Sequence, residues 1–164
     1  MSIHRHRVTP FLWYDGQAEE AAHHYVSVFK KGSKVTSASP MVVTFELEGQ
    51  PLIALNGGPM FKFTEAISLS VDCATQREVD YYWDRLAEGG SHGRCGWLKD
   101  RWGLSWQVVP RALQECLSGK DKAGAQRAME AMLKMGKLDV AALRAAYDGA
   151  PRKAKPARKA RGRG

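Results

Sequence analysis

The chain has 164 residues, of which 44% are hydrophobic and 26% are charged, and these fractions exclude a wholly disordered polypeptide. The formal net charge is +8, but residues 152–163 alone contain seven lysines and arginines, and Arg5 and Arg7 lie near the N-terminus. Without these nine residues, the 25 basic residues fall to 16, against 17 acidic ones. The body of the chain therefore lacks the clustered positive charge that a nucleic-acid-binding surface requires.

The cysteines and the hydropathy pattern indicate the cellular compartment in which the protein is expected. Cys73, Cys95 and Cys116 are widely separated and form no CxxC pair, so neither a zinc knuckle nor a thioredoxin-type site is expected. Their odd number argues against a disulfide framework and favours a reducing compartment. The sequence contains no signal segment and no apolar stretch of the roughly 20 residues that span a bilayer. We expect a cytoplasmic protein with no membrane partner.

The first half of the chain predicts the element order β-α-β-β-β. The run VTPFLWY is rich in aromatic and branched residues, which favours a buried strand. Asp15 is the expected N-cap of the helix that follows, whose apolar face carries Ala18, Ala22, Tyr25 and Phe29. The expected elements are a strand at 8–14, a helix at 17–29 and strands at 35–36, 42–47 and 51–55.

The second half repeats this order. Thr75 and Glu78 form a Ser/Thr-x-x-Glu capping box, which predicts that a helix begins there. Apolar residues recur in this helix at i, i+3, i+4 and i+7, namely Val79, Tyr82, Trp83 and Leu86. The expected strands are at 66–71, 93–95, 96–99 and 104–109. A unit of roughly 50–60 residues is therefore duplicated in this chain.

After Pro110 the strand patterns stop, and helices are expected at 112–117, 122–135 and 139–147. Met129, Met132 and Leu133 share one face of the second helix, which predicts a core or dimer contact. From Ala150 onward the composition cannot build a core. The expected organisation is a flexible leader at 1–7, one domain at 8–149 and a disordered basic tail at 150–164. Within the domain we expect modules at about 8–59 and 61–110, followed by helices at 111–149.

Several long stretches carry a family pattern: TPFLWYDGQAEEA (9–21), ELEGQPLIALNGGP (46–59), FKFTEAISLSVDC (61–73), VDYYWDRL (79–86), CGWLKDRWGLSWQVVP (95–110) and AQRAMEAMLKMGKLDVAALRAAYDG (125–149). They resemble the PhnB-like family, often labelled 3-demethylubiquinone-9 3-methyltransferase, of the vicinal-oxygen-chelate (glyoxalase–bleomycin-resistance) superfamily. The resemblance covers about residues 8–149. It implies an α+β fold in which two β-α-β-β-β modules form half-barrels with C-terminal helices, and a homodimer in which these parts of two chains pack together. The loop at 37–41 is shorter than in the family.

The resemblance also allows a test for a metal site. Metal-dependent members of the superfamily use His and Glu side chains on the inner strand faces, where the metal acts as a Lewis acid. In this chain the usual His position falls near Glu65 or Ala66, and Gln107, a poor ligand, replaces the usual Glu. We expect no cofactor and no intact metal site. A divalent metal held by Glu65, His92 or Gln107, in a glyoxalase- or dioxygenase-type enzyme, is the alternative.

Two further groups of residues do not support a catalytic or cofactor-binding role. The loop Asn56-Gly57-Gly58-Pro59 does not open a helix, so it does not fit the cofactor cradle of the commonest methyltransferases, and we do not expect methyl transfer. His23 and His24 fall away from the apolar face of the first helix and are expected at the solvated surface. Whether any reaction is catalysed is left open by the sequence.

What remains is a pocket for a small molecule. Strand periodicity places Ser105, Gln107 and Val109 on one face, which by the resemblance lines the concave side. Trp13, Asn56 and Trp97 lie on neighbouring segments and would add aromatic walls and an amide. The expected ligand pocket therefore consists of Trp13, Asn56, Glu65, Trp97, Ser105 and Gln107, and suits a small, partly aromatic ligand. The simpler alternative is that the tryptophans fill the core.

The basic tail at 150–164 has two interpretations. Its charges, with Pro and Ala spacers and no aromatic residue, are typical of tails that contact nucleic acid without sequence preference. An accessory protein that reaches nucleic acid through this tail is thus a third hypothesis. The alternative is a solvated tail that affects only solubility.

Overall fold

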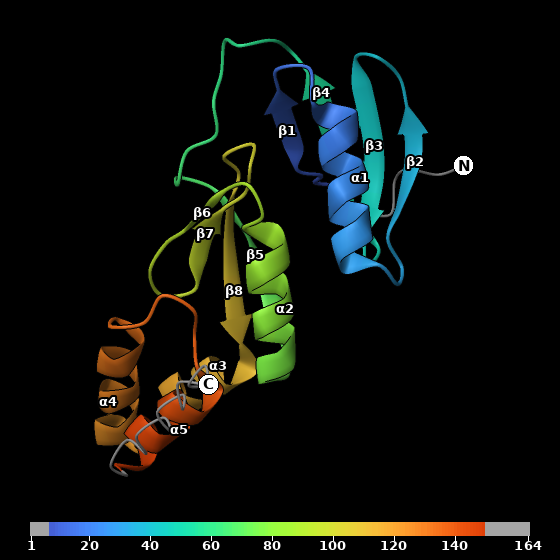
Figure 1. Ribbon diagram of the computed structural model, residues 1–164. Helices are drawn as coiled ribbons and strands as arrows, with labels where there is room; N and C mark the ends of the chain where they lie inside the picture. The colour runs from blue at the N-terminus through green and yellow to red at the C-terminus, as the bar shows by residue number, and fades with distance from the viewer. Residues whose placement is uncertain (1–6, 150–164) are drawn as a thin grey trace, which may run out of the picture.

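The computed structural model describes residues 7–149, which form two four-stranded sheets and a group of C-terminal helices (Figure 1). The basic tail and most of the predicted leader lie outside the described residues. No helix within residues 7–149 is long and apolar enough to cross a bilayer. A long loop between β4 and β5 joins the two sheets (Figure 1).

The first module contains β1 Phe11–Tyr14, α1 Ala18–Phe29, β2 Lys34–Ala38, β3 Val42–Leu47 and β4 Gln50–Asn56. Its strand order is β1-β4-β3-β2, with β1 parallel to β4 and the other pairs antiparallel. The β-α-β-β-β prediction is confirmed for this half. Side chains alternate along β3, where Val43, Phe45 and Leu47 are buried and the intervening residues are half-buried, so α1 covers only one face of the sheet.

The second module contains β5 Ser68–Cys73, α2 Gln76–Leu86, β6 Ser91–His92, β7 Trp97–Lys99 and β8 Ser105–Pro110. Its order, β5-β8-β7-β6, repeats that of the first sheet and confirms the duplication. The predicted strand at 93–95 is wrong. Cys95 and Gly96 both have left-handed backbone angles, with φ of 57° and 82°, and such residues turn the chain rather than extend a ladder.

The C-terminal helices are α3 Arg111–Leu117, α4 Lys122–Met132 and α5 Val140–Asp148. They enclose a second, smaller core of Leu113, Met135, Leu138 and Leu143. The predicted second helix is shortened because the chain turns after Met132, which carries Met135 into this core. Met129 and Leu133 remain exposed, whereas Met132 is partly buried against this core, so only part of the predicted face contributes to it.

A buried carboxylate ties the two modules together. Asp100, in the turn between β7 and β8, is 3% exposed and accepts hydrogen bonds from the Tyr25 hydroxyl (2.7 Å) and the Trp106 indole (2.8 Å). The backbone N–H groups of Trp102 and Leu104 donate to its other oxygen, each at 3.0 Å. Tyr25 belongs to α1 and Asp100 to the second module, so this network fixes how the modules pack.

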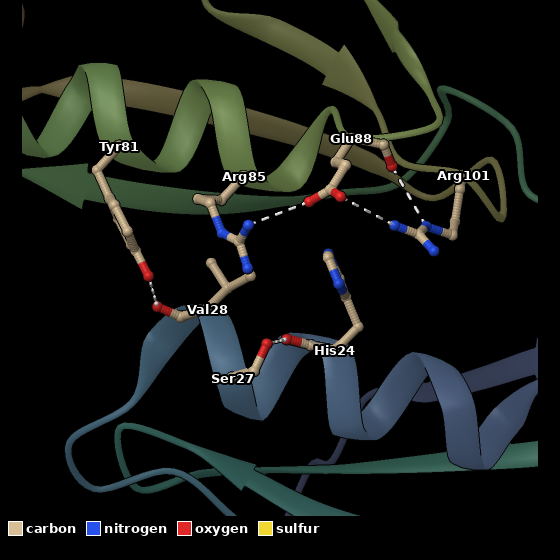
Figure 2. A network of polar contacts seen from close by, with 7 residues as sticks. All are labelled: His24, Ser27, Val28, Tyr81, Arg85, Glu88 and Arg101. Atoms are coloured by element: carbon tan, nitrogen blue, oxygen red, sulfur yellow. Dashed lines mark hydrogen bonds and ion pairs between the residues drawn. The ribbon is translucent and has the colours of Figure 1, made fainter.

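A second set of polar contacts joins α1 to α2 and to the following turns (Figure 2). The Tyr81 hydroxyl donates to the carbonyl oxygen of Val28 at 2.9 Å. Glu88 pairs with Arg85 and Arg101, and the His24 ring points from α1 toward these three side chains (Figure 2). The prediction that His24 is solvated is wrong. Its ring packs against Trp102 at 5.5 Å, and its Nε2 atom is buried with no hydrogen-bond partner within residues 7–149.

This geometry predicts acid sensitivity at His24. Burial lowers the pKa of His24, and the Arg101 and Arg85 guanidinium groups lower it further, whereas Glu88 opposes the shift. The folded state therefore binds the proton less tightly than the unfolded chain. The resulting loss of stability is absent well above about pH 6.5, the unperturbed pKa. It grows as the pH falls from there to the folded-state pKa, and it stays constant at lower pH.

The measurement is the melting temperature as a function of pH. His24→Gln is expected to flatten the decline in melting temperature between about pH 7 and pH 5, because the titrating group is removed. His23→Gln, at an exposed position of the same helix, is the matched control and should leave the decline unchanged. Equal declines in the wild type and both variants would contradict the role of His24.

Candidate functional site

The helix-free face of the second sheet is a row of polar side chains with one tryptophan. Leu98, Trp106 and Val108 are buried beneath it, which confirms the predicted alternation in β8. Gln107 is the register partner of Trp97, and its amide nitrogen donates to the Ser68 hydroxyl at 2.8 Å. We call this surface the polar face, defined by Ser68, Ser70, Trp97, Lys99, Ser105 and Gln107.

Four of the six predicted pocket residues meet at the polar face. Trp97, Ser105 and Gln107 lie on it directly, and Glu65 reaches its edge by an ion pair with Lys99 at 2.6 Å. The hydrogen bond from Lys99 lowers the pKa of Glu65, so this carboxylate stays ionised. Lys99 is the register partner of Ser105, whose hydroxyl oxygen is buried and has no hydrogen-bond partner in the described part of the chain. The face thus offers hydroxyl and amide groups beside one ion pair.

The other two predicted residues lie in the first module. Trp13 donates from its indole nitrogen to the Gly58 carbonyl oxygen at 2.8 Å, and a Cβ on Gly57 would overlap the Trp13 ring. Asn56 lies at the end of β4, and both ends of its side-chain amide are hydrogen-bonded to the chain. Its oxygen accepts from the Ala18 N–H at 2.9 Å, and its nitrogen donates to the Pro40 carbonyl oxygen at 2.9 Å.

Asn56 therefore has a structural role at the start of α1. The prediction that Asp15 is the N-cap of this helix is wrong, because the helix begins three residues later and its N-cap, Gln17, makes no side-chain cap bond. The Asn56 oxygen meets the first helical N–H instead. Since each end of its amide makes one hydrogen bond to the chain, Asn56 positions the neighbouring loop, and only its second N–H and second lone pair are left for a ligand.

Trp13 lines a hollow between the two modules. The sequence did not predict this hollow. We call it the aromatic pocket; its volume is about 640 Å³, and it is lined by Trp13, Tyr14, Asp15, Gln17, Pro59, Phe61, Lys62, Phe63, Lys99, Arg101, Trp102 and Gly103. The ring of Phe61 meets Trp13 edge-on at 4.9 Å, and Phe63 meets Tyr14 at 5.3 Å. The available signal was the run Phe61-Lys62-Phe63, which alternates rings and a cation within a loop.

The lining of the aromatic pocket contains three cationic side chains. Lys62, Lys99 and Arg101 face it, against the single carboxylate of Asp15. Lys99 is paired with Glu65, and Arg101 lies 3.8–3.9 Å from Glu20 and Glu88. Lys62 makes no ion pair or hydrogen bond within residues 7–149, so its ammonium group is available to an anion. Lys99 belongs to both the pocket and the polar face.

The three weak metal candidates are each engaged in a different contact. The His92 ring stacks on Trp83 at 4.7 Å, Glu65 is held by Lys99, and Gln107 donates to Ser68. Among residues 7–149 no three His, Cys, Asp or Glu side chains lie close enough together to hold a metal ion. A metal centre normally requires three or four protein ligands, so the side chains present do not fit one.

The Gly57-Gly58 loop does not form a cofactor cradle either. Both glycine N–H groups donate to the Tyr14 carbonyl oxygen, at 3.0 and 3.3 Å, and the loop leads into the linker between the sheets. A phosphate or sulfonium cradle needs free N–H groups at the start of a helix. The loop instead fixes the position of Trp13.

Comparison with known proteins places this architecture in a family. Residues 6–109 match the family model described as 3-demethylubiquinone-9 3-methyltransferase. A PhnB protein from Bacillus cereus, described with the same enzyme name, is 32% identical, with a TM-score of 0.59 over 64% of this chain and 99% of that one. Protein PA1353 from Pseudomonas aeruginosa is 21% identical, with a TM-score of 0.54 over 64% of this chain and 97% of that one, and supports the fold. No curated protein matches the sequence. The chain belongs to the PhnB-like, 3-demethylubiquinone-9 3-methyltransferase family.

Proposed function

We propose that this PhnB-like protein binds a small organic molecule with an aromatic ring and an anionic group in the aromatic pocket. The observation that carries the proposal is a hollow of about 640 Å³ that combines the rings of Trp13 and Phe61 with the Lys62 ammonium group. Aromatic side chains favour edge-on and offset contacts with a ligand ring. A cation without a protein partner favours the anionic group by a charge-assisted hydrogen bond.

The polar face extends this site. It shares Lys99 with the aromatic pocket, and it carries the neutral hydrogen-bonding groups of Ser68 and Gln107, whereas Ser105 is buried and out of a ligand's reach. A ligand longer than a single ring would reach these groups from the pocket. This combination of apolar walls with a few polar groups is typical of small-molecule sites.

A second copy of the chain is the proposed partner. Six large apolar side chains have more than half of their surface exposed and lie before or on β1, before β3 and on the linker: Val8, Phe11, Met41, Met60, Phe61 and Ile67. Single soluble chains rarely expose such a group together. A homodimer that covers these residues would also close the aromatic pocket, because Phe61 lines both surfaces.

Enzymatic alternatives have less support in the geometry. Methyl transfer, named in the family description, finds no cofactor cradle at Gly57-Gly58. A metal-dependent reaction of the glyoxalase or dioxygenase type needs converging ligands, and Glu65, His92 and Gln107 are engaged in separate contacts. Ligand binding is therefore the function that the site supports best.

The test is calorimetric titration with indole-3-propionate and with tryptophol, which has the same ring but a neutral alcohol. Indole-3-propionate is expected to bind more tightly. Lys62→Gln should weaken its binding about tenfold, the effect of losing one charge-assisted hydrogen bond. Trp13→Leu should weaken both compounds, because the ring contact is lost. Light scattering of the same samples should give twice the mass of one chain.

Lys31→Gln is the matched control, since Lys31 is an exposed lysine in the turn after α1. It removes one positive charge without touching the pocket, and it should leave both affinities unchanged. Equal binding of the acid and the alcohol, or no effect of Lys62→Gln, would contradict the proposed anionic ligand. No binding of either compound would contradict the aromatic site itself.

A further inference from the structure

A second cleft lies between the modules and shares no residue with the aromatic pocket. We call it the acidic cleft. Its volume is about 510 Å³, and it lies where the β3–β4 hairpin and the end of α1 approach β5 and α2. It is lined by Pro10, Phe29, Leu47, Glu48, Gln50, Leu52, Leu69, Ser70, Val71, Asp72, Ala74, Glu78, Tyr82, Trp106 and Arg111.

The floor of the acidic cleft is apolar and rigid. Phe29 of α1 stacks on Tyr82 of α2, with ring centroids 5.1 Å apart and an angle of 29° between the planes. On its other side Phe29 stacks on Trp106 at 5.7 Å and 30°. These contacts join the two modules and hold the rings in place. The floor can therefore receive an apolar ligand body without rearrangement.

Three of the four charged side chains that line the cleft are acidic, and one of these three carboxylates has no partner within residues 7–149. Asp72 is paired with Arg111 at 2.6 Å. The Glu78 carboxylate accepts the N–H groups of Ala74 and Thr75 in the capping box of α2. The Glu48 carboxylate has no hydrogen bond or ion pair within residues 7–149. The cleft thus presents one uncommitted carboxylate beside an apolar floor.

Glu48 reaches the cleft from the tight turn at the tip of the β3–β4 hairpin. Glu48 and Gly49 form the tip between β3 and β4 with φ of 48° and 88°, the left-handed angles of a tight two-residue turn. Asn, Asp and Gly are the usual residues at such positions, so a Glu is uncommon there. Burial, with the Glu48 charge as the next cause, raises the pKa of Tyr82 to about 12, and its hydroxyl stays protonated.

We propose that the acidic cleft binds a small organic cation, an ammonium or guanidinium group on an aromatic or aliphatic body, with Glu48 as the charge partner and the Phe29–Tyr82 stack as the apolar contact. The net negative charge of this lining repels anions, whereas an anion is the ligand proposed for the aromatic pocket. The two sites therefore select ligands of opposite charge, and this proposal does not rest on the proposed function.

The experiment is calorimetric titration of the full chain with tryptamine, tryptophol and indole-3-propionate, which share one ring and differ in charge. Tryptamine is expected to bind, with Glu48→Gln weakening it about tenfold through loss of the charge-assisted contact. Glu48→Asn should weaken it equally and keep the fold, because Asn tolerates the left-handed backbone. Glu46→Gln is the control, since Glu46 lies on the same hairpin, pairs with Lys34 and does not line the cleft.

Three outcomes would overturn the proposal: no tryptamine binding, equal affinity for tryptamine and tryptophol, or equal weakening by Glu46→Gln and Glu48→Gln. Loss of tryptamine binding in Trp13→Leu but not in Glu48→Gln would also overturn it, because the cation would then occupy the aromatic pocket. The proposed function is tested by the anionic probe and the Lys62 variant, so each proposal fails on its own measurement.

Discussion

Replacing Asp100 by Asn is expected to lower the free energy of unfolding by about 3 kcal/mol, measured by urea unfolding followed by circular dichroism. The Asn amide has the same shape but only one acceptor oxygen. It would place an NH₂ group either against the Tyr25 hydroxyl and the Trp106 N–H, or against two backbone N–H groups. Either orientation leaves buried donors without an acceptor, and such groups each cost about 1–3 kcal/mol.

Two further variants separate this network from charge in general. Tyr25→Phe removes one donor to the carboxylate and its contact with the Tyr14 hydroxyl but leaves the carboxylate its other partners, so a smaller loss of about 1–2 kcal/mol is expected. Asp84→Asn removes a carboxylate from an exposed pair with Lys137 and should cost less than about 1 kcal/mol. If Asp100→Asn were as mild as Asp84→Asn, the buried carboxylate would not be what holds the modules together.

Truncating Leu143 to Ala is expected to cost about 2–5 kcal/mol, because this side chain is fully buried in a small core that cannot collapse to fill the cavity. The core consists only of Leu113, Met135, Leu138 and Leu143 with partly buried neighbours. Amide hydrogen exchange should show lost protection in α4 and α5, while β3, β4 and β8 keep theirs. The reason is that the two cores are separate clusters.

Leu133→Ala is the matched control, since Leu133 is 50% exposed in the segment after α4. It should change the free energy of unfolding by less than about 0.5 kcal/mol. If Leu143→Ala removed protection equally from both sheets, the helices and the sheets would instead unfold as one cooperative unit.

Much of the fold could be predicted from local patterns. The strand at 42–47 was predicted with its observed bounds, because period-two alternation and branched residues are local properties. The capping box of Thr75 and Glu78 was confirmed with both reciprocal hydrogen bonds, since its partners are three residues apart. Strand ends were less accurate: the first strand begins at Phe11 rather than Val8, because β1 pairs with β4 only from that residue.

The candidate site was predictable only in part. Periodicity placed Ser105 and Gln107 on one face, and the structure adds Trp97, the register partner of Gln107, to them. Trp13 does line a pocket, but its neighbours Phe61, Lys62 and Phe63 come from a linker with no periodicity, so no pattern could bring them together. Asn56 has the hydrogen-bonding groups of a ligand contact, yet both ends of its amide are used by the chain.

By itself, the sequence determined the duplicated β-α-β-β-β order, the helical C-terminal part and the apolar faces of α1 and α2, because these depend on residues within a few positions of one another. Tertiary structure alone decided that Tyr25 would meet Asp100, 75 residues away, and that His24 would pack on Trp102. It also decided that the modules would enclose two clefts of opposite charge. Such contacts arise when separate elements pack, and the side-chain periodicity of one element contains no information about which residues of another will face it.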